Sequence, residues 1–141
     1  MKEYLLDTHI LIWLLKYDRR LNENIREDID YYQHTYYASV ESLREIVILQ
    51  SLKKITLTLK VEQIISFLEK IQIHIISVEI NHIKKLEKLP VFTIGGKTHD
   101  DPFDRLLIAQ AIANKYILIS SDRKFPFYTE SCGLKLLINE R

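Results

Sequence analysis

Apolar residues along this chain form short runs of strand type that alternate with longer segments of helical spacing. Strands that alternate with helices in this way predict an α/β protein, with a mostly parallel central sheet of about five strands and helices on both faces. The runs that predict strands are Tyr4–Leu6, Thr35–Ala38, Ile73–Val78, Tyr116–Ile119 and Leu134–Ile138.

Three segments between these runs carry apolar residues three and four positions apart, the spacing of one helix face. Two helices are therefore predicted over about residues 61–71 and 80–89. A third helix, which runs through Leu106–Ile112, is apolar nearly all round, so we expect it to be buried.

Start signals support the helices. Asp101 can cap the third helix, and Pro102 suits its first position. Ser39 is a plausible cap for a further helix that runs to about residue 50. The segment Val91–Asp100 contains two consecutive glycines and is predicted to be the longest loop and the best candidate for a flexible flap.

Composition narrows the class of protein. The length of 141 residues suits one domain over residues 1–141, and 20 basic against 19 acidic residues exclude nucleic-acid binding by bulk charge alone. A single cysteine, Cys132, excludes an intrachain disulfide and fits a reducing compartment. Asp7, Thr8 and His9 interrupt the first apolar run, which is too short to span a bilayer. We therefore expect a cytoplasmic protein without a membrane segment.

Acidic residues gather where ligands bind in open α/β sheets, outside the carboxyl ends of the strands. Like charges brought together destabilise a fold unless a cation neutralises them, and Mg²⁺ accepts such an all-oxygen environment. One or two such ions can activate a water for hydrolysis of a phosphodiester. The acids are Asp7 after the first strand, Glu41 and Glu45 after the second, Asp101 and Asp104 before the fourth, and Asp122 after it.

Most of these acids also have a structural interpretation. Asp101 is more readily explained as a helix cap, Asp104 as an acid that complements the helix dipole, and Asp122 as a turn residue. Asp7 is harder to explain in this way, because an acid at the end of a buried strand is unfavourable without a partner. Their joint placement at one edge favours a functional site. The chain has no Gly-rich phosphate loop, which weighs against nucleotide-driven chemistry.

Four blocks of sequence surround the acids, and they occur in order from residue 5 to about residue 125. The blocks are Leu5-Leu6-Asp7-Thr8-His9, Ser39-x-x-Ser42-x-x-Glu45-Ile46, His99-x-Asp101-Pro102-Phe103-Asp104-Arg105-Leu106-Leu107-Ile108-Ala109-Gln110-Ala111 and Ile119-Ser120-Ser121-Asp122. Together they resemble the PIN-domain family, and most of all its bacterial VapC-like branch, the toxins of type II toxin–antitoxin pairs. The third block is long and specific.

The resemblance implies a PIN fold, an endoribonuclease that depends on Mg²⁺ or Mn²⁺ and cleaves RNA with a metal-activated water, and inhibition by a small cognate antitoxin protein. Asp101 ranks second as a site residue, as a cap that adds negative field, and Arg105 is a candidate for phosphate contact. Glu41 does not match the family's acid. The family's catalytic and metal-binding acids fall on Asp7, Glu45, Asp104 and Asp122, and its small hydroxyl residues on Thr8 and Ser120.

Other functions remain open from the residues alone. A PIN-like module that binds RNA or protein without cleavage is one, although clustered negative charge would repel phosphates. A phosphatase or a deoxyribonuclease with the same acids is another. His9 and His99 flank the predicted site and could contact RNA. Trp13 is expected in the core or on the surface of a homodimer rather than as a base-stacking platform.

Overall fold

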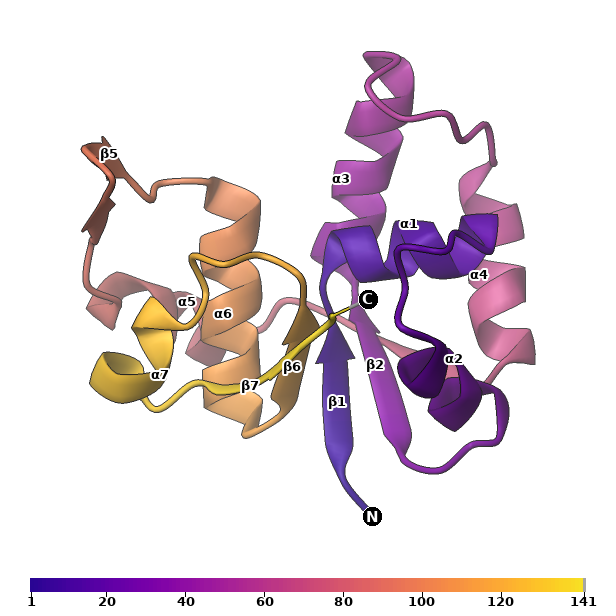
Figure 1. The fold of residues 1–141 in the computed structure, drawn as a ribbon. Helices are drawn as coiled ribbons and strands as arrows, with labels where there is room; N and C mark the ends of the chain where they lie inside the picture. The colour runs from indigo at the N-terminus through magenta and orange to yellow at the C-terminus, as the bar shows by residue number, and fades with distance from the viewer. Residues whose placement is uncertain (141) are drawn as a thin grey trace.

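A sheet of five parallel strands forms the centre of the computed structural model, which describes residues 1–140 (Figure 1). The strand order is β3-β2-β1-β6-β7, and every pairing in this sheet is parallel. The predicted class and sheet are confirmed, and the strand ends differ from the predicted ends by at most two residues. The strands are β1 (Glu3–Leu6), β2 (Thr35–Ser39), β3 (Ile73–Ile76), β6 (Ile117–Ser120) and β7 (Lys135–Ile138).

Helices cover both faces of the sheet, as predicted, and two apolar cores result (Figure 1). Successive residues of β1 point to opposite faces, so Leu6 belongs to the first core and Leu5 to the second. The first core is covered by α1 (Thr8–Lys16), α2 (Glu23–Asp30), α3 (Val40–Ser51) and α4 (Val61–Lys70). The second is covered by α5 (Ile80–Lys88), α6 (Pro102–Asn114) and α7 (Phe127–Cys132).

The capping predictions are confirmed. The Ser39 hydroxyl accepts a hydrogen bond from the Glu41 backbone N–H at 3.0 Å, and Pro102 occupies the first position of α6. All residues from Leu106 to Ala111 are buried, as the apolar character of this helix predicted. No helix within residues 1–140 is both long enough and apolar enough to cross a bilayer.

The segment Val91–Asp100 is not the open loop that the sequence analysis predicted. It contains a small antiparallel hairpin of β4 (Thr93–Ile94) and β5 (Lys97–Thr98). Gly95 and Gly96 connect the two strands with φ of 58° and 80°. Positive φ at both central residues is the requirement of a type I′ turn, and glycine meets it without strain. The two glycines therefore indicate a tight turn.

Three helices were not predicted. In α1, four of the six residues from Ile10 to Leu15 are buried, so no polar stripe reveals a helical period. The α2 helix has only eight residues and α7 only six, too few for a clear pattern. Two of them matter for the site, because Asp7 caps α1 and α7 carries Tyr128.

Candidate active site

A cavity of about 290 Å³ lies at the carboxyl ends of the parallel strands and is bordered by acids from four segments. Asp7 follows β1, Glu45 lies on α3, Asp101 and Asp104 open α6, and Asp122 follows β6. The structure thus brings together the four acids that the sequence analysis assigned to the site, with the second-ranked Asp101 beside them. We call this space the acid cavity.

Asp7 is the most enclosed of the acids, with 5% of its surface exposed. It caps α1: its Oδ1 accepts a hydrogen bond from the Thr8 backbone N–H at 2.6 Å. Its Oδ2 accepts a hydrogen bond from the Ser120 hydroxyl, also at 2.6 Å. Burial raises the pKa of the Asp7 carboxyl, and the negative charge of Asp122 adds to the effect, although the hydrogen bond from Ser120 opposes it. Two hydrogen bonds thus hold the Asp7 carboxyl in place. Its raised pKa indicates that the charged form is still unfavourable without a neighbouring cation.

Glu45 faces the same cavity from α3. Partial burial raises the pKa of its carboxyl, and the charges of Asp101 and Asp7 raise it further. Hydrogen bonding by the Thr8 hydroxyl opposes this rise in the pKa of Glu45. The Thr8 and Ser42 hydroxyls form a hydrogen bond with each other at 3.0 Å. Thr8 therefore supports the acids from within the fold, where it is 1% exposed.

Two acids at the start of α6 differ in role. Asp101 is the helix cap, as predicted, and its Oδ1 accepts hydrogen bonds from the backbone N–H groups of Phe103 and Asp104 at 2.9 and 3.0 Å. Asp104 points into the cavity, where burial raises the pKa of its carboxyl to about 8. The charges of Asp7 and of the other cavity acids contribute to this rise. The acid cluster is thus unfavourable without a cation, as the sequence analysis expected.

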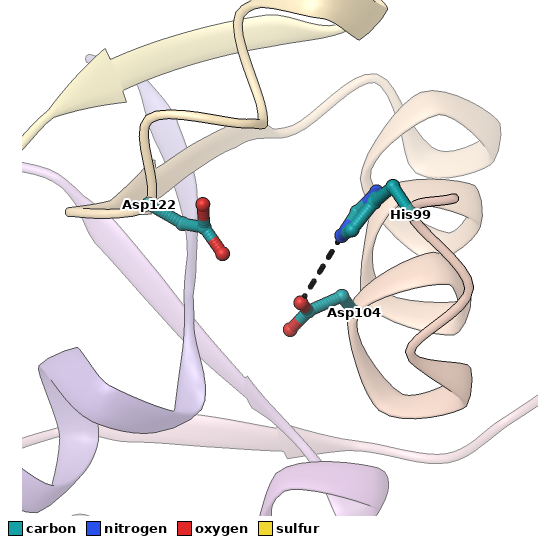
Figure 2. Close-up of side chains that lie close together, drawn as sticks. All are labelled: His99, Asp104 and Asp122. Atoms are coloured by element: carbon teal, nitrogen blue, oxygen red, sulfur yellow. Dashed lines mark hydrogen bonds and ion pairs between the residues drawn. The ribbon is translucent and has the colours of Figure 1, made fainter. Parts of the chain in front are cut away.

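His99 lies against Asp104 and is almost completely buried, with 5% of its surface exposed. Its Nε2 is 3.3 Å from the Asp104 Oδ2, and its Nδ1 is 2.8 Å from the Tyr128 hydroxyl. Figure 2 shows the carboxyl groups of Asp104 and Asp122 at the same space, with the imidazole beside Asp104. His99, Asp104 and Asp122 each offer one ligand atom, and these atoms lie within 4.8 Å of one another. Burial lowers the pKa of His99 and favours its neutral form, which can bind a metal.

A family model described as the PIN domain matches residues 4–129 of the chain. The chain belongs to the PIN-domain family. The match spans all four blocks that carried the resemblance, from Asp7 to Asp122. No curated protein matches the chain.

Solved structures share the PIN fold along almost the full chain. One is VapBC2 from Rickettsia felis bound to a DNA fragment from its promoter, with a TM-score of 0.63, 19% identity, and coverage of 98% of this chain and 99% of that one. DNA-bound VapBC from Salmonella typhimurium has a TM-score of 0.60 and 13% identity, with coverage of 98% of this chain and 98% of that one. VapBC-1 from nontypeable Haemophilus influenzae has a TM-score of 0.58 and 15% identity, with coverage of 96% of this chain and 97% of that one. At these identities the similarity is one of fold.

The donor set decides whether a divalent cation suits this PIN domain. The acid cavity offers carboxylate oxygens from Asp7, Glu45, Asp104 and Asp122, the ligands that Mg²⁺ and Mn²⁺ prefer. Burial, and after it the charges of the other carboxylates, raise the pKa of Asp104, and a bound cation would offset both effects. The residues therefore fit such an ion, with His99 as an additional nitrogen donor at the edge of the set.

The remaining predicted site residues, Ser120 and Arg105, are each held by hydrogen bonds. Ser120 is fully buried, donates to Asp7, and accepts from the Asp122 backbone N–H at 3.0 Å, so it links two of the acids. The guanidinium of Arg105 donates to the Pro90 carbonyl at 2.9 Å and to the Tyr128 hydroxyl at 3.2 Å, and it does not border the acid cavity. Its role in phosphate contact stays a prediction.

His99 was predicted to flank the site. In the structure its ring is buried between Asp104 and Tyr128, and this burial was not predicted. The available signal was its place five residues before Asp104 and two residues before the helix cap Asp101. The signal that was missing is Tyr128, 29 residues further along the chain on a helix that was not predicted.

Proposed function

We propose that this PIN domain is a divalent-metal-dependent endoribonuclease and the toxin of a type II toxin–antitoxin pair. The observation that carries the proposal is the acid cavity, where carboxylates from four segments of a PIN domain meet in one space. The fold similarity to VapBC structures supports the toxin assignment. A module that only binds RNA gains nothing from this cluster, because uncompensated carboxylates repel phosphates.

Asp7, Glu45, Asp104 and Asp122 would hold Mg²⁺ or Mn²⁺. When bound, such an ion supplies an activated water and stabilises the leaving oxygen of a phosphodiester. The products would be a 5′-phosphate and a 3′-hydroxyl.

The chain's own residues fix the ligands before substrate arrives. Ser120 and the Thr8 backbone hold both oxygens of Asp7, which restricts the carboxylate to one orientation. His99 contacts Asp104, and the Tyr128 hydroxyl holds the imidazole through its other nitrogen. Ligands that are already oriented lose less entropy when metal and substrate bind.

The direct test is cleavage of end-labelled single-stranded RNA by the purified chain. We expect cleavage with Mg²⁺ or Mn²⁺ and none with EDTA. DNA of the same sequence and a small phosphate ester, incubated in parallel, test the deoxyribonuclease and phosphatase alternatives. Cleavage of RNA in thoroughly chelated buffer would contradict the proposed metal-dependent chemistry. Hydrolysis of the phosphate ester without cleavage of RNA would favour the phosphatase alternative.

The partner would be a small antitoxin that places an Arg or Lys side chain in the acid cavity. A guanidinium fits carboxylates in bidentate fashion and would compete there with the metal. Apolar surface for such a partner lies nearby, where Phe92 and Phe127 border a cavity of about 550 Å³ next to the hairpin. An Arg→Ala scan of the partner's tail, measured as residual RNA cleavage, tests this arrangement. If no basic residue of the tail affects inhibition, the partner acts elsewhere.

Assembly and location are part of the same proposal. We expect a homodimer in the cytoplasm, and light scattering of the purified chain tests the dimer. A monomer at micromolar concentration would contradict this expectation and leave the nuclease assignment in place.

A further inference from the structure

A second cavity, of about 260 Å³, adjoins the acid cavity and carries the opposite charge. Lys16, Arg20 and Lys54 border it, and no carboxylate does among the residues of 1–140. The border of the acid cavity shows the reverse, with five carboxylates and no Lys or Arg in the same part of the chain. His9 and Trp13 border both spaces. We call the second space the cation cavity.

One face of α1 connects the two cavities. His9, Trp13 and Lys16 stand at positions i, i+4 and i+7, which lie on the same side of a helix. The helix begins directly after Asp7 in the acid cavity and ends at Lys16 in the cation cavity. Nine residues at about 1.5 Å each give a path of roughly 13 Å along the axis. A nucleic-acid strand covers such a distance in a few nucleotides at about 3.4 Å per stacked base.

The charge of the cation cavity is only partly compensated. Arg20 is paired with Asp18 at 2.7 Å, and its guanidinium also lies 5.2 Å from the centre of the Trp13 ring. Lys16 donates one hydrogen bond, to the Thr56 hydroxyl at 2.7 Å, which leaves two of its three N–H donors. Neither Lys16 nor Lys54 forms an ion pair within the described residues 1–140. Two ammonium groups therefore remain available to an anion.

This arrangement suits a single strand of RNA. Proteins bind single strands with cationic groups that follow the backbone and with aromatic side chains that lie against the bases. A phosphate at the acid cavity requires a cation there, whereas a phosphate further along the same strand needs fixed positive side chains. The two cavities meet these two needs at the two ends of one helix.

We propose that the cation cavity is a substrate subsite, in which Lys16 and Lys54 hold a phosphate of the RNA a few nucleotides from the cleaved bond. His9 and Trp13 then lie against the nucleotides between the two phosphates. This inference rests on the proposed ribonuclease function. An acidic segment of a partner protein is the competing occupant, and the experiment separates the two.

The test compares the double variant Lys16→Gln/Lys54→Gln with the control Lys84→Gln/Lys88→Gln. Both remove two positive charges, and the control lysines are exposed on α5, which covers the other core. Each protein is given an RNA of about twelve nucleotides and a dinucleotide that is too short to reach the cation cavity. Circular dichroism confirms that the variants are folded.

We expect kcat/KM of Lys16→Gln/Lys54→Gln on the longer RNA to fall about tenfold or more, the effect of removing charge-assisted hydrogen bonds to one phosphate. The salt dependence of binding becomes less steep, by about 0.7 in log–log slope for each phosphate that the protein no longer neutralises. Cleavage of the dinucleotide stays at the wild-type rate, and the control variant keeps the wild-type rate on both substrates.

Two results would overturn the inference alone: equal losses in both double variants, or equal losses on both RNA lengths, while the wild type cleaves RNA normally. Unchanged cleavage of the longer RNA by Lys16→Gln/Lys54→Gln would exclude an RNA phosphate from the cation cavity and favour the acidic partner segment instead. A wild type that does not cleave RNA at all would overturn the proposed function, and this inference with it.

Discussion

The starts of α1 and α6 meet at the acid cavity, and each helix is capped by an aspartate, but the two caps differ in burial. Asp101 is exposed and satisfies two N–H groups of α6. Asp7 satisfies one N–H group of α1, is 5% exposed, and its pKa is raised in spite of the bond that Ser120 donates. Capping alone is a normal use of aspartate. An aspartate that caps a helix and is also buried beside other acids needs a further explanation, and the cation site proposed above would supply it.

The α6 helix also contributes a partly buried acid, Asp104, at its third position instead of its cap. Asp104 has a pKa of about 8 because burial and the neighbouring charges act together. The two helices thus separate tasks that coincide in α1: Asp101 begins the helix, and Asp104 faces the cavity. This separation makes the two functions of a site aspartate independently testable.

Asp7→Asn is expected to have the largest effect. The amide still caps α1 but is a poor ligand for a hard cation, so RNA cleavage should fall more than about 100-fold, since outer-shell partners alone typically account for 10–100-fold. The free energy of unfolding should stay the same or rise by about 1 kcal/mol, because one repelling charge is removed. Cleavage assays and urea unfolding measure the two effects.

Asp30→Asn is the matched control for that variant, because Asp30 is exposed at the end of α2, away from the cavity. We expect it to cleave RNA at the wild-type rate. If Asp7→Asn is unfolded enough in urea experiments to account for its whole loss of RNA cleavage, Asp7 serves folding and not metal binding.

The pH dependence of stability tests the charge on Asp104. Its pKa is about 8 in the folded chain against an ordinary value of 3.8, so between these values the folded protein holds a proton that the unfolded chain has released. Folding stability from this group is therefore present below about pH 4 and declines as the pH rises towards about 8. In EDTA, the melting temperature of the wild type should fall relative to that of Asp104→Asn over this range.

Addition of Mg²⁺ should reverse that decline in the wild type, because a cation that binds the ionised carboxylates stabilises the folded state. Asp104→Asn should respond less. Parallel melting curves for the two proteins without metal would show that Asp104 does not carry the expected proton.

Asp101→Asn is expected to have the smallest effect, with RNA cleavage within about twofold of the wild type, since Asn caps a helix as well as Asp does. Asp101→Ala should lower the free energy of unfolding by about 1 kcal/mol through loss of the cap. Thermal unfolding and cleavage assays measure both. If Asp101→Asn proves more damaging than Asp7→Asn, the assignment of Asp104 as the third acid of the site is wrong.

The fold class, the five strands and the meeting of the acids at one edge could all be predicted, because each depends on local spacing and on a general rule of α/β sheets. Ser39 and Asp101 were recognisable as caps from their neighbours alone. What could not be predicted depends on contacts between distant segments. His99 owes its buried position to Tyr128, and no local pattern records that pairing.

The cation cavity illustrates a second limit. The face of α1 that carries His9, Trp13 and Lys16 has regular spacing, but buried residues on the other sides of α1 hide its period. Lys54 follows α3, far from Lys16 in sequence, and only the packing of the two helices brings it near. Trp13 was expected in the core or on a dimer surface; it packs against the first core and also borders the acid cavity.

The order of the strands has a consequence for the chain during its synthesis. The two strands beside the acid cavity, β1 and β6, are neighbours in the sheet although they lie far apart in the sequence. The register, for example, pairs Tyr4 with Ile117. The bond between Ser120 and Asp7 likewise joins residues 113 positions apart. A ribosome-bound chain that has reached residue 110 already contains Asp7, Glu45 and Asp104, but it has neither the hydroxyl that orients Asp7 nor Asp122. The acid cavity is therefore completed only late in synthesis, after Ser120 and Asp122 have been added.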